Sequence, residues 1–404
     1  MSAAGEALPR TVRAFAATVV LGRLNKLGAA IAAIVAIALF AEPFATLRAN
    51  RIVSGNGLAF WDALPASAAS VGAALIVAGA GIALVRGRAK LRLAAGAAAL
   101  TAVLVLIGLV PGHLVAPGNA LARIGAAAGF WMLVFAFAIL VTDAIAKLEL
   151  ELGPAARLAV LALAALVVGA ILSSGLWNGL SVMKEYATHA DSFWQDGERH
   201  VELALGSLAA ALLVGAPLGV ACQRVPALGG VTLPVLNIVQ TIPSIAMYGL
   251  MMAPLAILAA RLPALAGIGV SGIGPAPALI ALLLYSLLPV VANVVVGLDG
   301  IPGAVVEAAR GMGMTARQRL LAVELPLAMP VILTGVRIVL VQNIGLVTVA
   351  ALIGAGGFGE FVLQGLGQSA TDLVLLGAVP TVALAFVAAI LLDALVEIIG
   401  ERQG

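Results

Sequence analysis

Long apolar runs alternate with short polar segments along almost the whole chain. A helix needs about 20 mostly apolar residues to cross the hydrocarbon of a bilayer, and about ten runs reach this length. They lie at residues 27–46, 66–85, 92–111, 122–142, 155–173, 201–222, 231–259, 276–298, 328–353 and 373–399. The seventh and ninth runs are long and contain proline or glycine, which predicts tilted or broken helices. The pattern therefore predicts an all-α integral membrane protein.

The composition agrees with lipid as the solvent. Of the 404 residues, 63% are hydrophobic and only 10% are charged, whereas a soluble domain has roughly 25% charged residues. The mean hydropathy is +1.16. Alanine and glycine are abundant, and small residues let membrane helices approach one another closely. A single cysteine, Cys222, excludes an intrachain disulfide.

Lysine and arginine are distributed unevenly between the two sides that these spans define. Cytoplasmic loops of membrane proteins are enriched in both residues. If the N-terminus is inside, most of the 22 basic residues fall on the inner side. The outer side holds only Arg48, Arg51, Arg123, Lys184, Arg199 and Arg261. This asymmetry predicts that the N-terminus and the C-terminus are both cytoplasmic.

The first apolar run follows a group of basic residues, as the apolar core of a signal peptide does. The group consists of Arg10, Arg13, Arg23 and Lys26. Because many further apolar runs follow, we interpret this segment as a retained membrane anchor rather than a cleaved signal.

The longest hydrophilic segment divides the chain. Residues 176–200 are polar and aromatic, and Trp177 and Trp194 suit a short helix lying along the membrane surface. We therefore predict an N-terminal transmembrane block of about five helices at 1–175, an extracytoplasmic linker at 176–200 and a second transmembrane domain at 201–404. The absence of a convincing internal repeat argues against an inverted-repeat secondary transporter.

Charge is concentrated in one loop between two apolar runs, at residues 300–326. Pro302 suits the first turn of a helix, and Gly313 suits a left-handed helix end. The sequence from Thr315 to Gln318 matches a capping box that opens a second helix. We expect two short helices with a glycine elbow, the second ending near Pro326. Two interpretations of this loop remain. It is either an amphipathic loop that lies on lipid headgroups or an element that a partner protein binds.

The amino-acid sequence of this loop resembles that of the EAA loop of ABC-importer permeases. The matching positions are Glu307, Ala308, Ala309, Gly313, Val323, Leu325 and Pro326, and only Val323, where isoleucine is usual, departs. The resemblance implies that the loop, called the coupling loop below, sits in a groove of an ATPase subunit. Glu307, Arg310 and Arg317 would supply polar contacts there, and Ala308 and Ala309 would permit close approach.

Other segments resemble the osmoprotectant branch of that family, in its longer form with extra N-terminal transmembrane helices. They are LNIVQTIPSIAMYGLM, LPLAMPVILTGVR and LIGAGGFGEFVLQGL, within about residues 197–404. The resemblance implies a type I importer domain in the bacterial inner membrane that carries a small osmoprotectant such as glycine betaine or choline. It also implies as partners a cytoplasmic ATPase dimer, an identical or paralogous second permease and an extracytoplasmic solute-binding protein.

We expect no cofactor and no nucleic acid on this chain. It has no phosphate-binding loop, so ATP and Mg²⁺ would be bound by the partner ATPase. No nucleophile–base constellation supports an enzyme. Other possibilities remain open: a permease for an amino acid or a sulfonate, an ion-coupled secondary carrier, or a membrane scaffold. A secondary carrier would need buried acids or paired charges in its spans, and Asp143 and Asp393 lie only at span ends.

Several polar residues lie within the predicted spans, where they are costly and suggest function. Gln240, Ser244 and Tyr248 are four residues apart and would share one helix face. The candidate translocation path consists of Asn237, Gln240, Thr241, Ser244, Tyr248, Asn293, Gln342 and Asn343. The alternative is hydrogen bonding between helices. These spans contain few aromatic residues, so we do not expect an aromatic cage that captures a quaternary ammonium in this chain.

A glycine-rich segment follows the ninth span. Its glycines are Gly354, Gly356, Gly357 and Gly359, and the segment matches the GxGxxG pattern of dinucleotide-binding proteins. That pattern requires a preceding β-strand, and here a membrane span precedes it, so we do not expect dinucleotide binding. We expect a bend near the outer end of the span, which we interpret as part of an outer gate and call the glycine bend. His113, His189 and His200 all fall on the predicted outer side without the spacing of metal ligands, so we expect solvated loop residues.

Overall fold

A computed structural model describes residues 25–51, 53–85, 87–116, 118–119, 121–148, 153–267 and 269–401. Part of the basic set used for orientation lies outside these residues: Arg10, Arg13, Arg23, Arg86 and Arg402. The chain divides into two compact units. Unit 1 is the described part of Met1–Gly153 with Ala162–Lys184, and unit 2 is the described part of Pro154–Leu161 with Glu185–Gly404.

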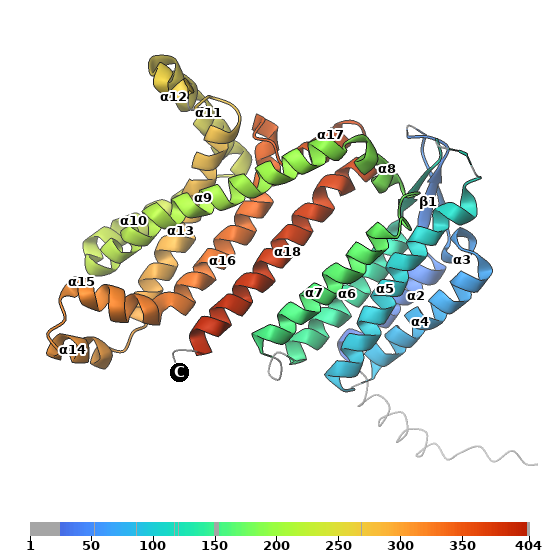
Figure 1. Cartoon of the computed structure of the whole chain (residues 1–404), viewed down its shortest axis with the longest axis horizontal. Helices are drawn as coiled ribbons and strands as arrows, with labels where there is room; N and C mark the ends of the chain where they lie inside the picture. The colour runs from blue at the N-terminus through green and yellow to red at the C-terminus, as the bar shows by residue number, and fades with distance from the viewer. Residues whose placement is uncertain are drawn as a thin grey trace, which may run out of the picture. The chain divides into compact units, whose positions relative to one another are not determined.

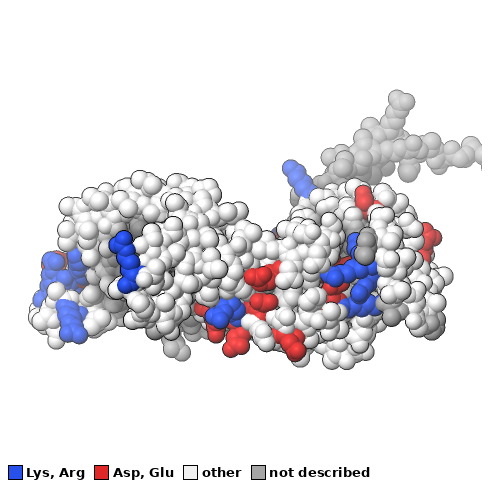
Figure 2. Space-filling view, turned by 90° about the horizontal axis from the view of Figure 1, so that it is seen from above, with Lys and Arg blue, Asp and Glu red and all other residues white. Residues whose placement is uncertain are grey.

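Within the described ranges, nine helical segments are long and apolar enough to cross a membrane. They are α4 (Ala66–Leu84), α5 (Ala89–Leu114), α6 (Ala128–Leu148), α7 (Pro154–Ser173), α9 (Ala190–Arg224), α11 (Ser244–Arg261), α13 (Pro275–Asp299), the segment Ala316–Ile353 that contains α16 (Leu325–Ala350), and α18 (Thr371–Glu401). Figure 2 shows one face of the molecule, on which uncharged surface predominates and charges gather in a few groups. The helical membrane fold expected from the sequence is confirmed.

The first predicted span is shorter than expected. Helix α2 covers Lys26–Phe40, which is 15 residues. Pro43 follows, and a proline disfavours helical backbone in the residue before it. The chain then enters a strand, β1 (Ala45–Arg48), instead of continuing the helix.

A small sheet in unit 1 adds to the expected all-helical architecture. Strand β1 pairs antiparallel with β2 (Asn56–Leu58) on one side and with β3 (Arg123–Ala126) on the other. The predicted span 122–142 therefore begins as a strand, and α6 starts only at Ala128. A short helix, α3 (Phe60–Ala63), follows β2.

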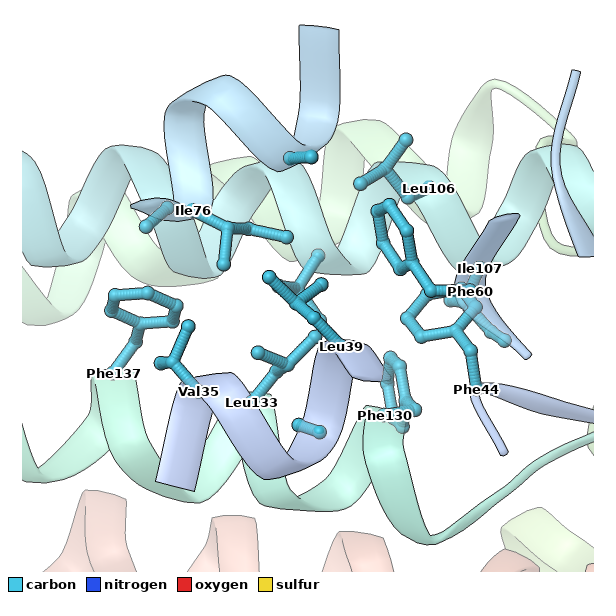
Figure 3. Packing of buried hydrophobic residues seen from close by; sticks show 14 of the residues in the cluster. Val35, Leu39, Phe44, Phe60, Ile76, Leu106, Ile107, Phe130, Leu133 and Phe137 are labelled. Carbon is cyan, nitrogen blue, oxygen red and sulfur yellow. The ribbon is translucent and has the colours of Figure 1, made fainter. Parts of the chain in front are cut away.

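Helices α2, α4, α5 and α6 of unit 1 enclose an aromatic and aliphatic core (Figure 3). The ring of Phe44 packs edge-on against those of Phe60, at 5.1 Å between centroids, and Phe130, at 6.0 Å. Helices α2 and α4 approach so closely that a Cβ atom on Gly28 would lie 1.9 Å from the carbonyl oxygen of Ala83. Unit 1 therefore has a core of its own.

The polar segment 176–200 contains more helix than expected. The short helix predicted there is α8 (Ser181–Thr188). From Ala190 the chain is already part of α9, which continues for 35 residues to Arg224. The division at 1–175, 176–200 and 201–404 stays a prediction.

In unit 2, α9, α13 and α16 pack together, and α18 packs on α16 (Figure 1). The predicted span 231–259 is broken into α10 (Pro226–Thr241) and α11. Ile242 has an extended backbone because Pro243 follows it. A short helix, α12 (Pro263–Gly267), follows α11, and α17 (Gly359–Gly367) precedes α18.

Candidate functional site

The coupling loop begins with α14 (Gly303–Gly311), which ends in a glycine elbow as predicted. Gly313 has a φ of +79°, in the left-handed region. Its N–H donates to the carbonyl oxygen of Arg310 at 2.9 Å, and the N–H of Met314 donates to that of Ala309 at 3.2 Å. These two bonds form a Schellman motif, which satisfies the last carbonyl groups of the helix. The elbow therefore has a defined shape.

The second helix, α15 (Ala316–Arg319), opens with the predicted capping box. The backbone N–H of Gln318 donates to Thr315 Oγ1 at 3.3 Å, and the backbone N–H of Thr315 donates to Gln318 Oε1 at 2.8 Å. Its expected end near Pro326 is wrong. The chain passes through a π-helical turn, η1 (Leu320–Glu324), directly into α16.

Pro326 explains why the register changes without ending the helix. Proline has no N–H, so the α-helical ladder lacks a donor at this position. The N–H of Leu325 donates instead to the carbonyl oxygen of Leu320, five residues back. Such π-helical turns occur mostly within α-helices and often at functional sites. The coupling loop is therefore continuous with α16.

Most charged positions named for docking are exposed. Arg310 Nη1 donates to Glu307 Oε1 at 2.8 Å, and both side chains remain more than half exposed. Arg317 and Ala308 are exposed as well, but Ala309 is 2% exposed and packs inward instead of facing a partner. A shallow open groove lies beside these residues, lined by Met312, Gly313, Met314, Thr315, Arg317, Gln318, Leu321 and Ala322. Leu325 is half-buried and Pro326 exposed.

The base of the loop contains a buried carboxylate that the sequence analysis missed. Glu324 Oε1 accepts a hydrogen bond from Arg319 Nε at 2.6 Å, and Glu324 Oε2 pairs with Arg224 Nη2 at the end of α9. The Glu324 side chain is 5% exposed. No spacing rule connects Arg224 to a residue 100 positions away. The only available signal was an acid with apolar neighbours at the end of the charged loop.

The structure does not keep three of the path candidates on one helix face. Gln240 lies on α10, whereas Ser244 and Tyr248 lie on α11, beyond the break at Pro243. Gln240 Nε2 donates to the carbonyl oxygen of Tyr285 at 2.7 Å, and Tyr248 Oη donates to that of Leu346 at 2.9 Å. Gln240 and Tyr248 thus form hydrogen bonds between helices, which was the alternative interpretation.

Asn343 also serves packing between helices. Its side chain is fully buried, and its Nδ2 donates to Ser207 Oγ at 2.8 Å and to Ser286 Oγ at 3.0 Å. These contacts join α16 to α9 and α13. Asn293 Nδ2 bonds within its own helix, to the carbonyl oxygen of Pro289. Among the other path candidates, Asn237 and Thr241 are exposed, and Ser244 and Gln342 are half-buried.

The glycine bend has the backbone that its sequence predicts. Left-handed φ values occur at Gly354 (+72°), Gly356 (+81°) and Gly357 (+90°). The N–H of Gly357 donates to Asp196 Oδ1 at 3.1 Å, which ties the bend to α9. A Cβ atom on Gly359 would lie 2.1 Å from the carbonyl oxygen of Thr348, so only glycine fits there.

His200 is not a solvated loop residue, and this expectation is wrong. Its side chain is fully buried, its Nε2 lies 2.9 Å from the carbonyl oxygen of Ile344, and its ring packs on Phe358 with centroids 5.3 Å apart. The fold buries it because residue 200 lies inside α9 and faces the glycine bend. His113 is exposed, and His189 is partly exposed with Nδ1 2.9 Å from the carbonyl oxygen of Glu185.

Electrostatics at the glycine bend involves a second carboxyl group. Burial raises the pKa of the Glu360 carboxyl, and the nearby Asp196 carboxylate raises that pKa further. The N–H of Gly356 bonds to the Glu360 carboxyl and lowers its pKa, but this contribution is smaller. The bend thus brings two carboxyl groups near each other outside the apolar part of the spans.

The described chain is a multi-pass helical membrane protein with the two short helices of the coupling loop at one end of unit 2 (Figure 1). Residues 208–403 match the family of binding-protein-dependent transport system inner membrane components. Residues 25–183 match the N-terminal domain of the ABC transporter permease YehY. The chain belongs to this family of ABC permeases, in the longer form, and is a multi-pass inner membrane protein.

Each of the following curated relatives matches about half of this chain or slightly more. The osmoprotectant import permease OsmW of Salmonella typhimurium is 41% identical over 47% of this chain and 83% of its own length. The osmoprotectant import permease OsmY of the same organism is 37% identical over 59% of this chain and 92% of its own length. The choline transport permease OpuBB of Bacillus subtilis is 37% identical over 46% of this chain and 79% of its own length. Among solved structures, a chain of the inward-facing methionine transporter MetNI is 23% identical, with a TM-score of 0.45. The match covers 52% of this chain and 95% of that chain.

Proposed function

We propose that this chain is the membrane-spanning subunit of an importer that moves a small osmoprotectant, driven by ATP hydrolysis on a partner chain. The observation that carries the proposal is the coupling loop, with two capped helices that expose charged and apolar side chains. Relatives named for osmoprotectant and choline transport support the substrate class, with glycine betaine or choline as the first candidates.

The coupling loop is proposed to sit in a groove of a cytoplasmic ATPase subunit. Exposed Glu307, Arg310 and Arg317 would supply charged contacts, and Ala308 would let the two backbones approach closely. Met312 is 74% exposed and Leu321 is 54% exposed. Covering such side chains completely contributes about 1.5–3 kcal/mol each. This exposed apolar surface favours a protein partner over solvent.

Transport would proceed by exchange between two arrangements of the helices. ATP binding closes the ATPase dimer and moves the two coupling loops, one on each of two permease domains. Rigid-body movement of packed helices then closes one side of the path and opens the other. A solute-binding protein on the opposite face would deliver the substrate. Exposed Asn237 and Thr241, with Ser244 and Gln342, would contribute polar groups to the path between the permease domains.

Capture of the substrate is assigned to the separate binding protein. A quaternary ammonium is held best by several aromatic faces. The described aromatic cluster of unit 2 lies around α8, α9 and α17 and packs ring against ring, as Phe193 does with Phe358 at 5.2 Å between centroids. The path candidates include a single aromatic residue, Tyr248, and its ring is buried. The chain would therefore pass the substrate without holding it tightly.

Reconstitution tests the proposed function directly. The chain is assembled with its partner ATPase and solute-binding protein, and labelled glycine betaine uptake into proteoliposomes is measured. We expect uptake that requires both ATP and the binding protein and that choline competes for. Competition by an amino acid or a sulfonate, without competition by choline, would reassign the substrate. Uptake driven by an ion gradient without nucleotide would contradict the mechanism.

A further inference from the structure

Two consecutive residues at the end of α9 hold both ends of the coupling loop. Gln223 Nε2 donates to Asp299 Oδ1 at 3.1 Å, and Asp299 is the last residue of α13 before the loop. Arg224 pairs with Glu324 at the end of the π-helical turn. Helix α9 is distant from the loop along the chain, yet side-chain contacts attach it to both of the loop's ends.

The pair with Glu324 differs from an ordinary surface ion pair. The Glu324 side chain is 5% exposed and that of Arg224 is 34% exposed. Exposed pairs such as Arg310–Glu307 contribute little, because water and salt screen them. Removing one partner of a buried pair leaves a charge without compensation and is much more disruptive. Arg319, which is 9% exposed, keeps Glu324 paired inside the loop even without Arg224.

Hydrogen bonds fix the shape of the loop between its exposed surface and its base. Its first helix is closed by the Schellman motif, and its second is opened by the capping box. The second helix is continuous with α16. These bonds and the unbroken helix connect the exposed surface of the loop to Glu324 at its base.

The other end of α9 contacts the glycine bend. Asp196 accepts the hydrogen bond from Gly357, and His200 packs on Phe358 while its Nε2 contacts the carbonyl oxygen of Ile344. A helix of 35 residues is about 50 Å long. In Figure 1, α14 and α15 lie at one end of unit 2, and α17 lies toward the other. The same helix thus contacts the loop and the bend.

We propose that α9 carries movement of the coupling loop to the glycine bend, and that Arg224 is the positioning residue that attaches α9 to the loop. The inference rests on the proposed function, because it presumes that an ATPase moves the loop. It adds the route by which that movement crosses unit 2. Asp196 and His200 are the contacts at the receiving end.

The test separates transmission from docking. Arg224→Gln removes the contact between α9 and Glu324 but leaves Glu324 paired with Arg319 and Gln223 bonded to Asp299, so folding is preserved better than in Glu324→Gln. Arg224→Lys keeps the charge, and Arg261→Gln is the matched control, because Arg261 is an exposed arginine at the end of α11. Each variant is assembled with its ATPase and binding protein in proteoliposomes. Bound ATPase, ATP hydrolysis and labelled glycine betaine uptake are measured together.

We expect Arg224→Gln to bind the ATPase and hydrolyse ATP as the unchanged protein does, while betaine moved per ATP falls by about tenfold or more. Arg224→Lys should recover part of that ratio, and Arg261→Gln should leave it unchanged. A normal ratio in Arg224→Gln, or loss of bound ATPase from it, would overturn the inference. Failure of the unchanged complex to couple uptake to ATP would instead overturn the proposed function.

Discussion

A single backbone conformation sets the shape of the coupling loop. Gly313 has a positive φ, whereas Gly311, two residues earlier, is the last residue of α14. A Cβ atom added at either position meets no atom within 4 Å. The two glycines therefore differ in backbone conformation and not in available space, so they form a matched pair for mutation.

Gly313→Ala is expected to weaken the loop, and Gly311→Ala is not. A side chain in the left-handed region costs about 1–2 kcal/mol, whereas alanine inside a helix gains about 0.5–1 kcal/mol over glycine. If docking needs the elbow, 1.4 kcal/mol corresponds to about tenfold weaker binding of the ATPase. Co-purification of the ATPase with each variant measures this, and equal binding by both variants would contradict the role of the elbow.

Glu360 is expected to make stability depend on pH. Its pKa is raised in the folded protein, so the folded state binds the proton more tightly than the unfolded state does. The stabilisation is present below the ordinary carboxyl pKa and is lost as pH rises through the raised value. Glu360→Gln should therefore increase the melting temperature at neutral pH more than at acidic pH. Thermal unfolding at several pH values, with the exposed Glu198→Gln as control, measures this difference.

At the scale of elements, ion pairs join helices within unit 2. Arg337 on α16 pairs with Asp393 on α18, and their side chains are 35% and 38% exposed. From the sequence alone, Arg337 could extend to the membrane surface by itself. Paired charges are also what an ion-coupled carrier would need in its spans. This pair therefore offers a test between a structural role and a coupling role.

A charge swap distinguishes these two roles. Asp393→Asn should lower stability by about 1 kcal/mol or less, because the pair is partly exposed. The double variant R337D/D393R should recover that loss, and ATP-driven uptake should continue in both. A structural pair tolerates exchange of its partners, whereas a proton or ion site does not. Loss of uptake in both variants at unchanged stability would favour an ion-coupled carrier.

At the scale of the whole molecule, the parts assigned to transport lie in unit 2. The coupling loop, its buried carboxylate and the glycine bend all belong to residues 185–404. Unit 1 has its own core and matches a separate family model, whereas the relatives OsmW and OpuBB align with only about half of this chain. Unit 1 is therefore expected to modify transport rather than to perform it.

Truncation tests this division. A chain of residues 185–404 should insert in the membrane, bind the ATPase and support ATP-driven uptake within about tenfold of the full chain, because a compact domain keeps its own core. The truncation also removes Arg157, which pairs with Glu397 on α18. Arg157→Gln in the full chain is the control for that loss. Absence of ATPase binding by the truncated chain, with binding by the control, would contradict the division.

Expectations that rest on neighbouring residues agree with the structure. The elbow at Gly313 and the capping box at Thr315 follow from backbone geometry within a few residues. A tilt or break in the run 231–259 was expected from its prolines and glycines, but the position of the break before Pro243 was not. Failures occur where distant segments meet. His200 is polar in sequence but buried by the glycine bend. Asn343 looks like a path residue but bonds to serines on two other helices.

The sequence by itself determined that lipid is the solvent, where most of the membrane spans lie, the capped coupling loop and the permease family, because hydropathy, helix-end chemistry and the EAA spacing are properties of contiguous residues. Only the tertiary structure decided how α9 holds the base of that loop. Glu324 pairs with Arg224 because packing of α9 against α13 and α16 brings a partly exposed arginine to a buried carboxylate. A contact between residues 100 positions apart depends on packing, which no local pattern specifies.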